Sequence, residues 1–320
     1  MSVVDFAQST KSVYDIVPDR AAELKKELGE EDAYQFGPLL FSKQAPRSDL
    51  VWAHNVWSDL RVVKTVSISA AVNELRAMKR KWHRAHAPED QFRRSSLIES
   101  ELPRWKRPIA TFPSKLVPSD WGSWTLLDRD WLLAATKNSS PFLDGVARFE
   151  EINPEKEIKP PSQAYKKLWE ALCLAGHWPQ AGEVCVDLGG APGGWTWALL
   201  ELGAEVHTVD RADLDPNLSK YPLMTQRPFF HRADAFKFRP DYVKKKPDWV
   251  FSDVICYPER LKELMETWGG LEPRPNLVFT LKFQGETDFA MIEHFKKYPG
   301  STIRHLSVNK HEVTWIWLRQ

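Results

Sequence analysis

Cysteine, net charge and long apolar runs are all scarce in this chain. Three of its 320 residues are cysteines, Cys173, Cys185 and Cys256, and they form no C-x-x-C pair. Structural zinc and a disulfide framework are therefore not expected, and neither is a metal requirement. No apolar run approaches the ~20 residues that cross a bilayer. The first residues, MSVVDFAQSTKSVYD, lack the basic start and apolar core of a secretion signal, so we expect a cytoplasmic protein without a membrane partner.

Opposite charges nearly cancel, because 44 Lys and Arg residues face 43 Asp and Glu residues. No overall field therefore indicates nucleic-acid or membrane binding, and a basic binding surface would have to be local. A chain of 320 residues can hold two domains of ordinary size or one large one, and a hydrophobic content of 42% supports a full globular core. The segment 150–161, EEINPEKEIKPP, is charged, contains proline and has no periodicity. It predicts a linker at 151–161 between an N-terminal domain at 1–150 and a second domain at 162–320.

The clearest motif runs from Val184 to Trp195, VCVDLGGAPGGW. An apolar strand leads into four glycines and a proline, and glycine lets a backbone turn sharply beside a ligand because it has no Cβ. We expect the loop amides to point into a crevice at the carboxyl end of the strand. The spacing G-G-A-P-G-G differs from the dinucleotide and phosphate-loop fingerprints. With the acid Asp187 at the strand end, it favours a ligand with an amino-acid end and a nucleoside end, such as S-adenosylmethionine.

Further acids end the neighbouring strands. Asp210, in HTVDR, is placed to receive ribose hydroxyls, and Asp187 to accept from the ligand's amino group, directly or through water. Asp234, in RADAF, is placed to accept from an adenine amino group, or alternatively to cap a helix. The predicted cofactor contacts are Asp187, Gly189, Gly190, Ala191, Pro192, Gly193, Gly194, Trp195, Asp210 and Asp234.

After the linker, strands and helices alternate, which predicts an α/β fold. The expected strands are 184–188, 205–210, 229–232, 248–253, 276–283, 302–308 and 312–318. The expected helices are 163–175, one starting near 195, 258–268 and about 287–298. Crossover helices make the first five strands parallel, and the short connection between the last two predicts an antiparallel hairpin. The result is a Rossmann-like, mostly parallel sheet of seven strands with one reversed strand.

The first half of the chain is expected to form a smaller α+β domain, with 66–86 as one helix. From Arg76 to Arg107 it holds ten basic and four acidic residues, with Trp82, Phe92 and Trp105 among them. This is either a solvated face or a patch that follows phosphates and stacks on bases. The candidate RNA contacts are Lys79, Arg80, Arg84, Arg93, Arg94, Lys106 and Arg107.

Charged residues in the second half stand where chemistry is expected. Asp253 ends the strand DWVFSD, Lys282 lies in the otherwise apolar strand NLVFTLKF, and Glu312 begins the last strand. A lysine in a buried strand is costly unless it is paired or used. In the helix from 163, Lys167 flanks the apolar face while Lys166 points nearly opposite, so Lys167 is the one able to reach a site.

These residues resemble a known family. Lys167, Asp253, Lys282 and Glu312, in this order around DLGGAPGGW, look like the Lys-Asp-Lys-Glu tetrad of the FtsJ-type ribose 2′-O-methyltransferases. The resemblance covers 162–320 through the strings SQAYKKL, FSDV, NLVFTLKFQG and HEVTWIW. SSPFLDGVARFE and DAFKFRP are similar to the RlmM-like branch, which acts on large-subunit ribosomal RNA and carries an N-terminal RNA-binding extension with a THUMP domain. Only fragments of that extension, such as FGPLLFSKQ, are visible here.

The resemblance implies methyl transfer from S-adenosylmethionine to an RNA ribose 2′-hydroxyl. Lys282 would be the base or hold the developing alkoxide, Asp253 would orient Lys282, and Lys167 and Glu312 would complete the network. Burial disfavours the charge on Lys282 and the two acids favour it, and the sequence leaves the balance open. The alternatives are a messenger-RNA cap ribose methyltransferase, an inactive RNA-binding protein with a methyltransferase fold, and a small-molecule methyltransferase. The last would need neither the tetrad nor the basic patch.

Overall fold

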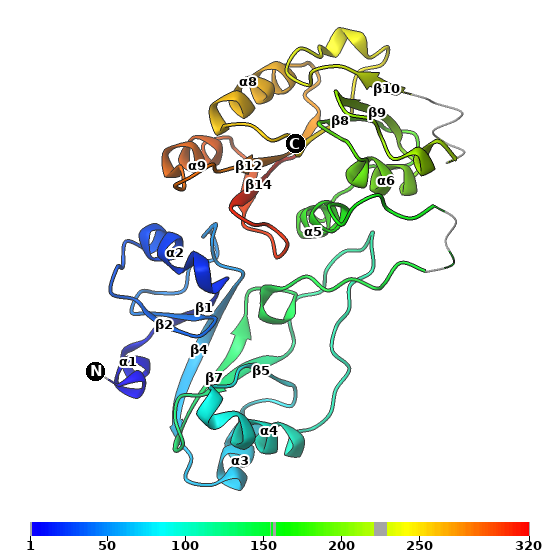
Figure 1. The fold of residues 1–320 in the computed structure, drawn as a ribbon. Coiled ribbons are helices and arrows are strands. Elements are labelled where there is room, and N and C mark those ends of the chain that lie inside the picture. The colour runs from blue at the N-terminus through cyan, green and yellow to red at the C-terminus, as the bar shows by residue number, and fades with distance from the viewer. Residues whose placement is uncertain (1, 154, 156–157, 221–228, 320) are drawn as a thin grey trace. The chain divides into compact units, whose positions relative to one another are not determined.

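The computed structural model describes residues 2–153, 155, 158–220 and 229–319 (Figure 1). The chain forms two compact units, Met1–Ala110 with Leu116–Arg148, and Thr111–Lys115 with Phe149–Gln320. The short segment Thr111–Lys115 packs with the second unit, where Phe112 stacks on Trp169 with 4.9 Å between ring centroids. The expected linker at 151–161 lies partly outside the described residues, and the roles expected for the domains stay predictions.

The first unit is built on a mixed seven-stranded sheet of order β2-β3-β1-β4-β7-β6-β5. Its strands are β1 (Ser12–Asp15), β2 (Tyr34–Phe36), β3 (Leu39–Ser42), β4 (Asn55–Lys64), β5 (Trp82–His86), β6 (Gly122–Leu126) and β7 (Trp131–Asn138). Only the β5–β6 pair is parallel among these ladders. The helices are α1 (Val3–Ser9), α2 (Ala21–Leu28), α3 (Ile68–Met78) and α4 (Phe92–Glu101). The expected α+β class is confirmed for this unit.

The predicted helix at 66–86 is wrong in its second half. The helix α3 ends at Met78, and Trp82–His86 is strand β5, paired with β6. Long-range packing decides this, because the Trp82 side chain is buried in the cluster beneath α3 and α4. Its indole nitrogen donates to the carbonyl oxygens of Leu75 and Lys79 at 2.8 Å, and this closes the end of α3. Trp82, which continued the apolar pattern of the helix, therefore belongs to a strand that packs beneath the helix.

The second unit holds the expected α/β sheet, with strand order β10-β9-β8-β11-β12-β14-β13. Its strands are β8 (Val184–Leu188), β9 (Glu205–Asp210), β10 (Phe229–Arg232), β11 (Trp249–Ser252), β12 (Asn276–Lys282), β13 (Ser301–Arg304) and β14 (Glu312–Trp317). The pairs from β10 to β12 are parallel, and β14 is antiparallel to both of its neighbours. The predicted mostly parallel sheet with one reversed strand is confirmed. Every residue of β8 and β11 is buried, as expected for central parallel strands.

Helices cover both faces of this sheet (Figure 1). They are α5 (Tyr165–Ala175), α6 (Gly194–Glu201), α8 (Pro258–Gly269) and α9 (Phe289–Lys296). Val278 and Ile316 pack in one cluster with residues of α5 and α6. Trp315, which precedes Ile316 in β14, packs against Phe295 of α9 on the other face, because successive side chains in a strand alternate.

Cys173, Cys185 and Cys256 are buried free thiols. None of the helices that the structure describes combines the length and the apolar character that a membrane crossing requires.

Candidate active site

The four residues of the predicted tetrad come from four elements that meet at one edge of the second sheet. Lys167 lies in the first turns of α5, and Asp253 follows the last residue of β11. Lys282 ends β12 and lies opposite Glu312, the first residue of β14, in the antiparallel ladder. Because β11 and β12 are parallel neighbours, their carboxyl ends share this edge with the start of the reversed strand.

The four charges form a compact alternating network. The Lys167 Nζ lies 2.9 Å from Asp253 Oδ1 and 2.6 Å from Glu312 Oε1. The Lys282 Nζ lies 3.1 Å from Asp253 Oδ1 and 4.0 Å from Glu312 Oε2. It also donates to the backbone carbonyl oxygen of Asp253 at 2.7 Å, a contact that no sequence pattern signals. Two cations and two anions in alternation compensate one another away from bulk water.

The two lysines differ in their access to solvent. The Lys167 side chain is 7% exposed, donates a hydrogen bond to Asp253 and forms an ion pair with Glu312, whereas the Lys282 side chain is 18% exposed. An amine nitrogen has one bond to carbon and three further positions for protons or a lone pair. Lys282 donates one hydrogen bond, to the Asp253 carbonyl oxygen, and its contact with Asp253 Oδ1 at 3.1 Å is an ion pair. Glu312 Oε2 at 4.0 Å is beyond hydrogen-bond range. Among the described contacts, the Lys282 nitrogen therefore keeps a position for a reacting group.

The glycine loop lies against this charged network. Val254, directly after Asp253, is so close to Gly189 that a Cβ on this glycine would lie 2.9 Å from the Val254 Cβ. The pKa of the Asp187 carboxyl beneath the loop is raised to about 7, chiefly by burial; a hydrogen bond from Thr196 lowers it, and the charges of Asp253 and Asp210 raise it. The charged network and the glycine loop therefore share one edge of the sheet.

The loop backbone is tied to β9, which corrects one expectation. The amides of Gly189 and Gly190 donate to the carbonyl oxygen of Val209, at 2.8 and 3.4 Å. The Ala191 amide donates to Asp210 Oδ2 at 3.0 Å. These three amides therefore do not point into a crevice, because the adjacent strand satisfies them.

The glycines themselves are required by close packing. A Cβ on Gly190 would lie 2.7 Å from Asp187 Oδ2, and a Cβ on Gly194 would overlap the Ser162 hydroxyl. Gly189 and Gly193 have φ of +78° and +113°, and at Gly193 a Cβ would overlap Leu218. The loop can pass this close to its supporting residues only without side chains.

The other predicted cofactor residues are placed in different ways. Asp187 is 1% exposed and accepts from the Thr196 hydroxyl at 2.7 Å, so its carboxylate lies beneath the loop. Trp195 is 3% exposed, and its indole donates to the Ala164 carbonyl oxygen at 2.9 Å as part of the core. Asp210 bridges the amides of Ala191 and Ala212.

Asp234 caps a turn, and the helix of the alternative interpretation does not begin there. Its Oδ1 accepts the Phe236 amide at 3.0 Å, and its side chain keeps 23% exposure. The contacts of these residues with a cofactor stay predictions.

The predicted RNA-binding residues of the first unit are spread over several elements, and four of the seven have partners within the protein. Lys79 donates to the Thr136 carbonyl oxygen at 2.7 Å, and Arg94 to that of Thr65 at 3.0 Å. Both Arg84 and Arg107 pair with Glu99 at 3.0 Å. The exposed residues left for RNA are Arg80, Arg93 and Lys106.

Sequence reasoning missed the polar residues that support the site. Thr196 and Thr208 share a hydrogen bond at 2.8 Å beneath the loop, and Glu170 of α5 holds the connection before Glu312. Glu170 carried a usable signal, since it lies three residues after Lys167 on the apolar side of α5. Among the described residues, no cluster of three or more His, Cys, Asp and Glu side chains could hold a metal ion.

Comparisons with known proteins agree with this geometry. The family model described as FtsJ-like methyltransferase matches residues 161–267. A protein named ribosomal RNA large subunit methyltransferase M, from Halorhodospira halophila, is 39% identical over 125 residues, or 38% of this chain and 35% of the relative. A protein of the same name from Proteus mirabilis is 31% identical over 163 residues, or 49% of this chain and 42% of the relative.

The chain thus spans about two fifths of the length of these curated relatives. Among solved structures, an rRNA methylase from Streptococcus thermophilus covers 44% of this chain and 89% of its own, with 13% identity and a TM-score of 0.32. A likeness this low supports no argument, and the strand order above stands without it. The FtsJ-like methyltransferase model thus matches the segment that holds the glycine loop, Lys167 and Asp253.

Proposed function

We propose that this chain transfers a methyl group from S-adenosylmethionine to the 2′-hydroxyl of an RNA ribose, with large-subunit ribosomal RNA as the substrate. The observation that carries the proposal is the Lys167–Asp253–Lys282–Glu312 network beside the glycine loop, with every neighbouring lysine–carboxylate distance within 4.0 Å. The substrate comes from the name of the matching relatives.

The residues around the glycine loop fit S-adenosylmethionine. The loop 189–194 contains no lysine or arginine that would favour a phosphate, and its glycines let the backbone pack closely on the residues that support it. Asp210 and Asp234 end adjacent parallel strands and retain partly exposed carboxylates for the hydroxyl and amino groups of a nucleoside. When bound, S-adenosylmethionine supplies a methyl group that is already activated for direct transfer.

The task left to the protein is to position the ribose and to remove one proton. Lys282 does the second, because its nitrogen keeps a position for a hydroxyl while a hydrogen bond and an ion pair with Asp253 hold it in place. In the neutral amine this position is a lone pair that takes the proton, and in the ammonium it is an N–H that stabilises the oxyanion. Either form needs the fixed orientation that Asp253 provides.

Lys167 and Glu312 hold Asp253 and Lys282 in place. Lys167 bridges the two carboxylates with contacts of 2.9 and 2.6 Å, so neither anion is left uncompensated at a partly buried edge. Glu312 lies opposite Lys282 across the β12–β14 ladder and limits the reach of its side chain. Holding the reacting groups in line supplies much of the rate in a transfer of this kind.

The loop after Asp253 supports an RNA acceptor. Ile255 and Tyr257 are 77% and 58% exposed, while Cys256 between them is buried. The loop begins directly after Asp253 and so passes beside the site. An exposed aromatic next to a ribose-modifying site suits stacking on an unpaired base. In the first unit Arg80, Arg93 and Lys106 remain the candidate phosphate contacts.

The proposal is tested by incubating the purified chain with labelled S-adenosylmethionine and large-subunit ribosomal RNA that lacks ribose methylation. We expect label in RNA with the wild type, and none with Lys282→Ala, although calorimetry shows cofactor binding in both. Label on an RNA base, or equal transfer by Lys282→Ala, contradicts the proposal.

A further inference from the structure

Glu170 is a buried acid that the proposed chemistry does not use. It lies in α5 and is 3% exposed, and glutamates are rarely buried this far without a partner. Its carboxylate accepts the amide of Ser307 at 3.0 and 3.1 Å, and the Ser307 hydroxyl at 2.5 Å. These two donors, one of them shared between both carboxylate oxygens, offset part of the cost of burying the carboxylate.

The partner of Glu170 belongs to the connection that leads into Glu312. This connection, residues 305–311, joins β13 to β14, and Glu312 follows it directly. Within it the Asn309 amide donates to the Leu306 carbonyl oxygen at 3.0 Å, and the Asn309 side chain donates to the Glu312 carbonyl oxygen at 3.1 Å. These hydrogen bonds therefore link the position of Ser307 to that of Glu312 at the start of β14.

Helix α5 thus holds the hairpin at two points. Lys167 binds the Glu312 carboxylate at 2.6 Å, and Glu170 binds Ser307 five residues earlier in the chain. Lys167 and Glu170 are three residues apart, a spacing that places side chains on one side of a helix. One rigid element therefore fixes both a charged partner of Glu312 and the backbone that carries it.

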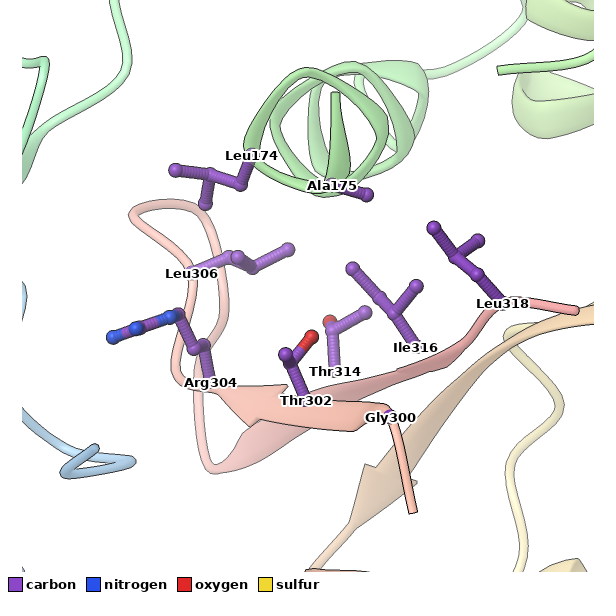
Figure 2. A pocket seen from close by; sticks show the side chains of 9 residues that line it. All are labelled: Leu174, Ala175, Gly300, Thr302, Arg304, Leu306, Thr314, Ile316 and Leu318. Carbon is purple, nitrogen blue, oxygen red and sulfur yellow. The ribbon is translucent and has the colours of Figure 1, made fainter. Parts of the chain in front are cut away.

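Packing also joins α5 to the hairpin, since Leu306 and Ile316 share a buried cluster with residues of α5, but it is incomplete near the end of the helix. Figure 2 shows a cavity between the end of α5 and the β13–β14 face, lined by Leu174, Leu306, Ile316 and their neighbours. Its volume is about 210 Å³, and Leu306, beside Ser307, lines it. Side chains that face a void lose part of their contact energy, so the hydrogen bonds of Glu170 carry more of the attachment.

We propose that Glu170 is a positioning residue, which fixes the Glu312 carboxylate for the methyl-transfer reaction by holding Ser307. This inference rests on the proposed function, because it gives Glu312 a part in that reaction. Glu170 itself touches no reacting atom. Its loss is expected to lower the rate at saturating substrates and to leave cofactor binding unchanged.

The experiment compares Glu170→Gln, which keeps the size but not the charge, with Glu30→Gln as a matched control. Glu30 in the first unit is buried and has the same kind of partners, the Ser42 hydroxyl at 2.5 Å and the Lys43 amide at 2.9 Å. We expect kcat to fall tenfold or more in Glu170→Gln, with KM for the cofactor within twofold of wild type. Glu30→Gln is expected to keep kcat within twofold even where its melting temperature falls as much.

A second pair of variants covers the case in which Glu170→Gln folds poorly. Ser307→Ala loses the short hydroxyl contact, and Ser307→Thr keeps a hydroxyl. We expect a several-fold loss of kcat in the first and recovery toward wild type in the second. An unchanged kcat in both folded Glu170→Gln and Ser307→Ala overturns the inference, and so does an equal fall in kcat and cofactor affinity.

Hydrogen exchange separates this inference from the proposed function. In Glu170→Gln the amides of 305–312 should exchange at least tenfold faster than in wild type, whether or not the protein methylates RNA. Unchanged exchange there refutes the positioning role. An inactive wild type with this exchange pattern refutes the proposed function instead.

Discussion

Replacing Lys167 by methionine should destabilise the second unit strongly, because this lysine compensates two carboxylates at once. Its Nζ lies 2.9 Å from Asp253 and 2.6 Å from Glu312, and its side chain is 7% exposed. After the change, Lys282 alone faces both acids, at 3.1 and 4.0 Å. Removing one partner of a buried ion pair costs about 3–5 kcal/mol.

The matched control is Lys166→Met, one residue earlier on the more exposed side of α5. Calorimetric unfolding should show a fall in melting temperature on the order of 10 °C for Lys167→Met. Lys166→Met should stay within about 0.5 kcal/mol of wild type, as surface substitutions do. Equal stabilities of the two variants would refute the view that the network depends on Lys167.

A double-mutant cycle with Glu312→Gln tests the same point more directly. Neutralising Glu312 removes one of the two anions that Lys167 compensates, so the double variant should be more stable than the sum of the single losses predicts. The expected coupling is at least about 1 kcal/mol. Strict additivity would show that the 2.6 Å contact contributes no stability.

Three further predictions follow from the loop and the first unit. Because burial raises the pKa of Asp187 to about 7, the free energy of unfolding of the wild type should fall as pH rises from about 4 to 7. Denaturant unfolding should show a weaker pH dependence of this free energy for Asp187→Asn, and an identical pH dependence in both proteins would contradict this. Gly193→Ala should weaken cofactor binding at least tenfold in calorimetry, because an added Cβ would overlap Leu218. Gly182 also has a positive φ, but a Cβ there would meet no atom within 4 Å, so Gly182→Ala should leave binding unchanged. Equal effects of the two changes would argue against a packed loop. Removing Arg80 and Arg93 together should reduce the salt dependence of RNA affinity by about 0.7 per lost phosphate contact, while Lys79→Ala should not; an unchanged slope would exclude both arginines.

The second unit was predictable because its signals are local. Buried parallel strands such as Val184–Leu188 read as short apolar runs, and a charged or glycine residue ends each strand or directly follows it. The choice of Lys167 over Lys166 needed only the helical period, and the structure buries Lys167 in the network.

The sequence-based predictions failed where contacts between residues far apart in the sequence determine the local structure. Strand β5 continued the apolar pattern of α3, and only its pairing with β6 and the burial of Trp82 make it a strand. The loop amides were expected to face a ligand, but the Val209 carbonyl oxygen of the adjacent strand accepts two of them. The partner of Glu170, Ser307, is 137 residues away in sequence, beyond the reach of any periodicity.

The most direct test of the central claim is the position of the methyl group on RNA. Purified wild type and Lys282→Ala are each incubated with S-adenosylmethionine and unmodified large-subunit ribosomal RNA, and sites resistant to alkaline cleavage are mapped. The account predicts one or a few 2′-O-methylated riboses with wild type and none with Lys282→Ala, which still binds the cofactor. Methylation of a base, or the same ribose sites with both proteins, would contradict it.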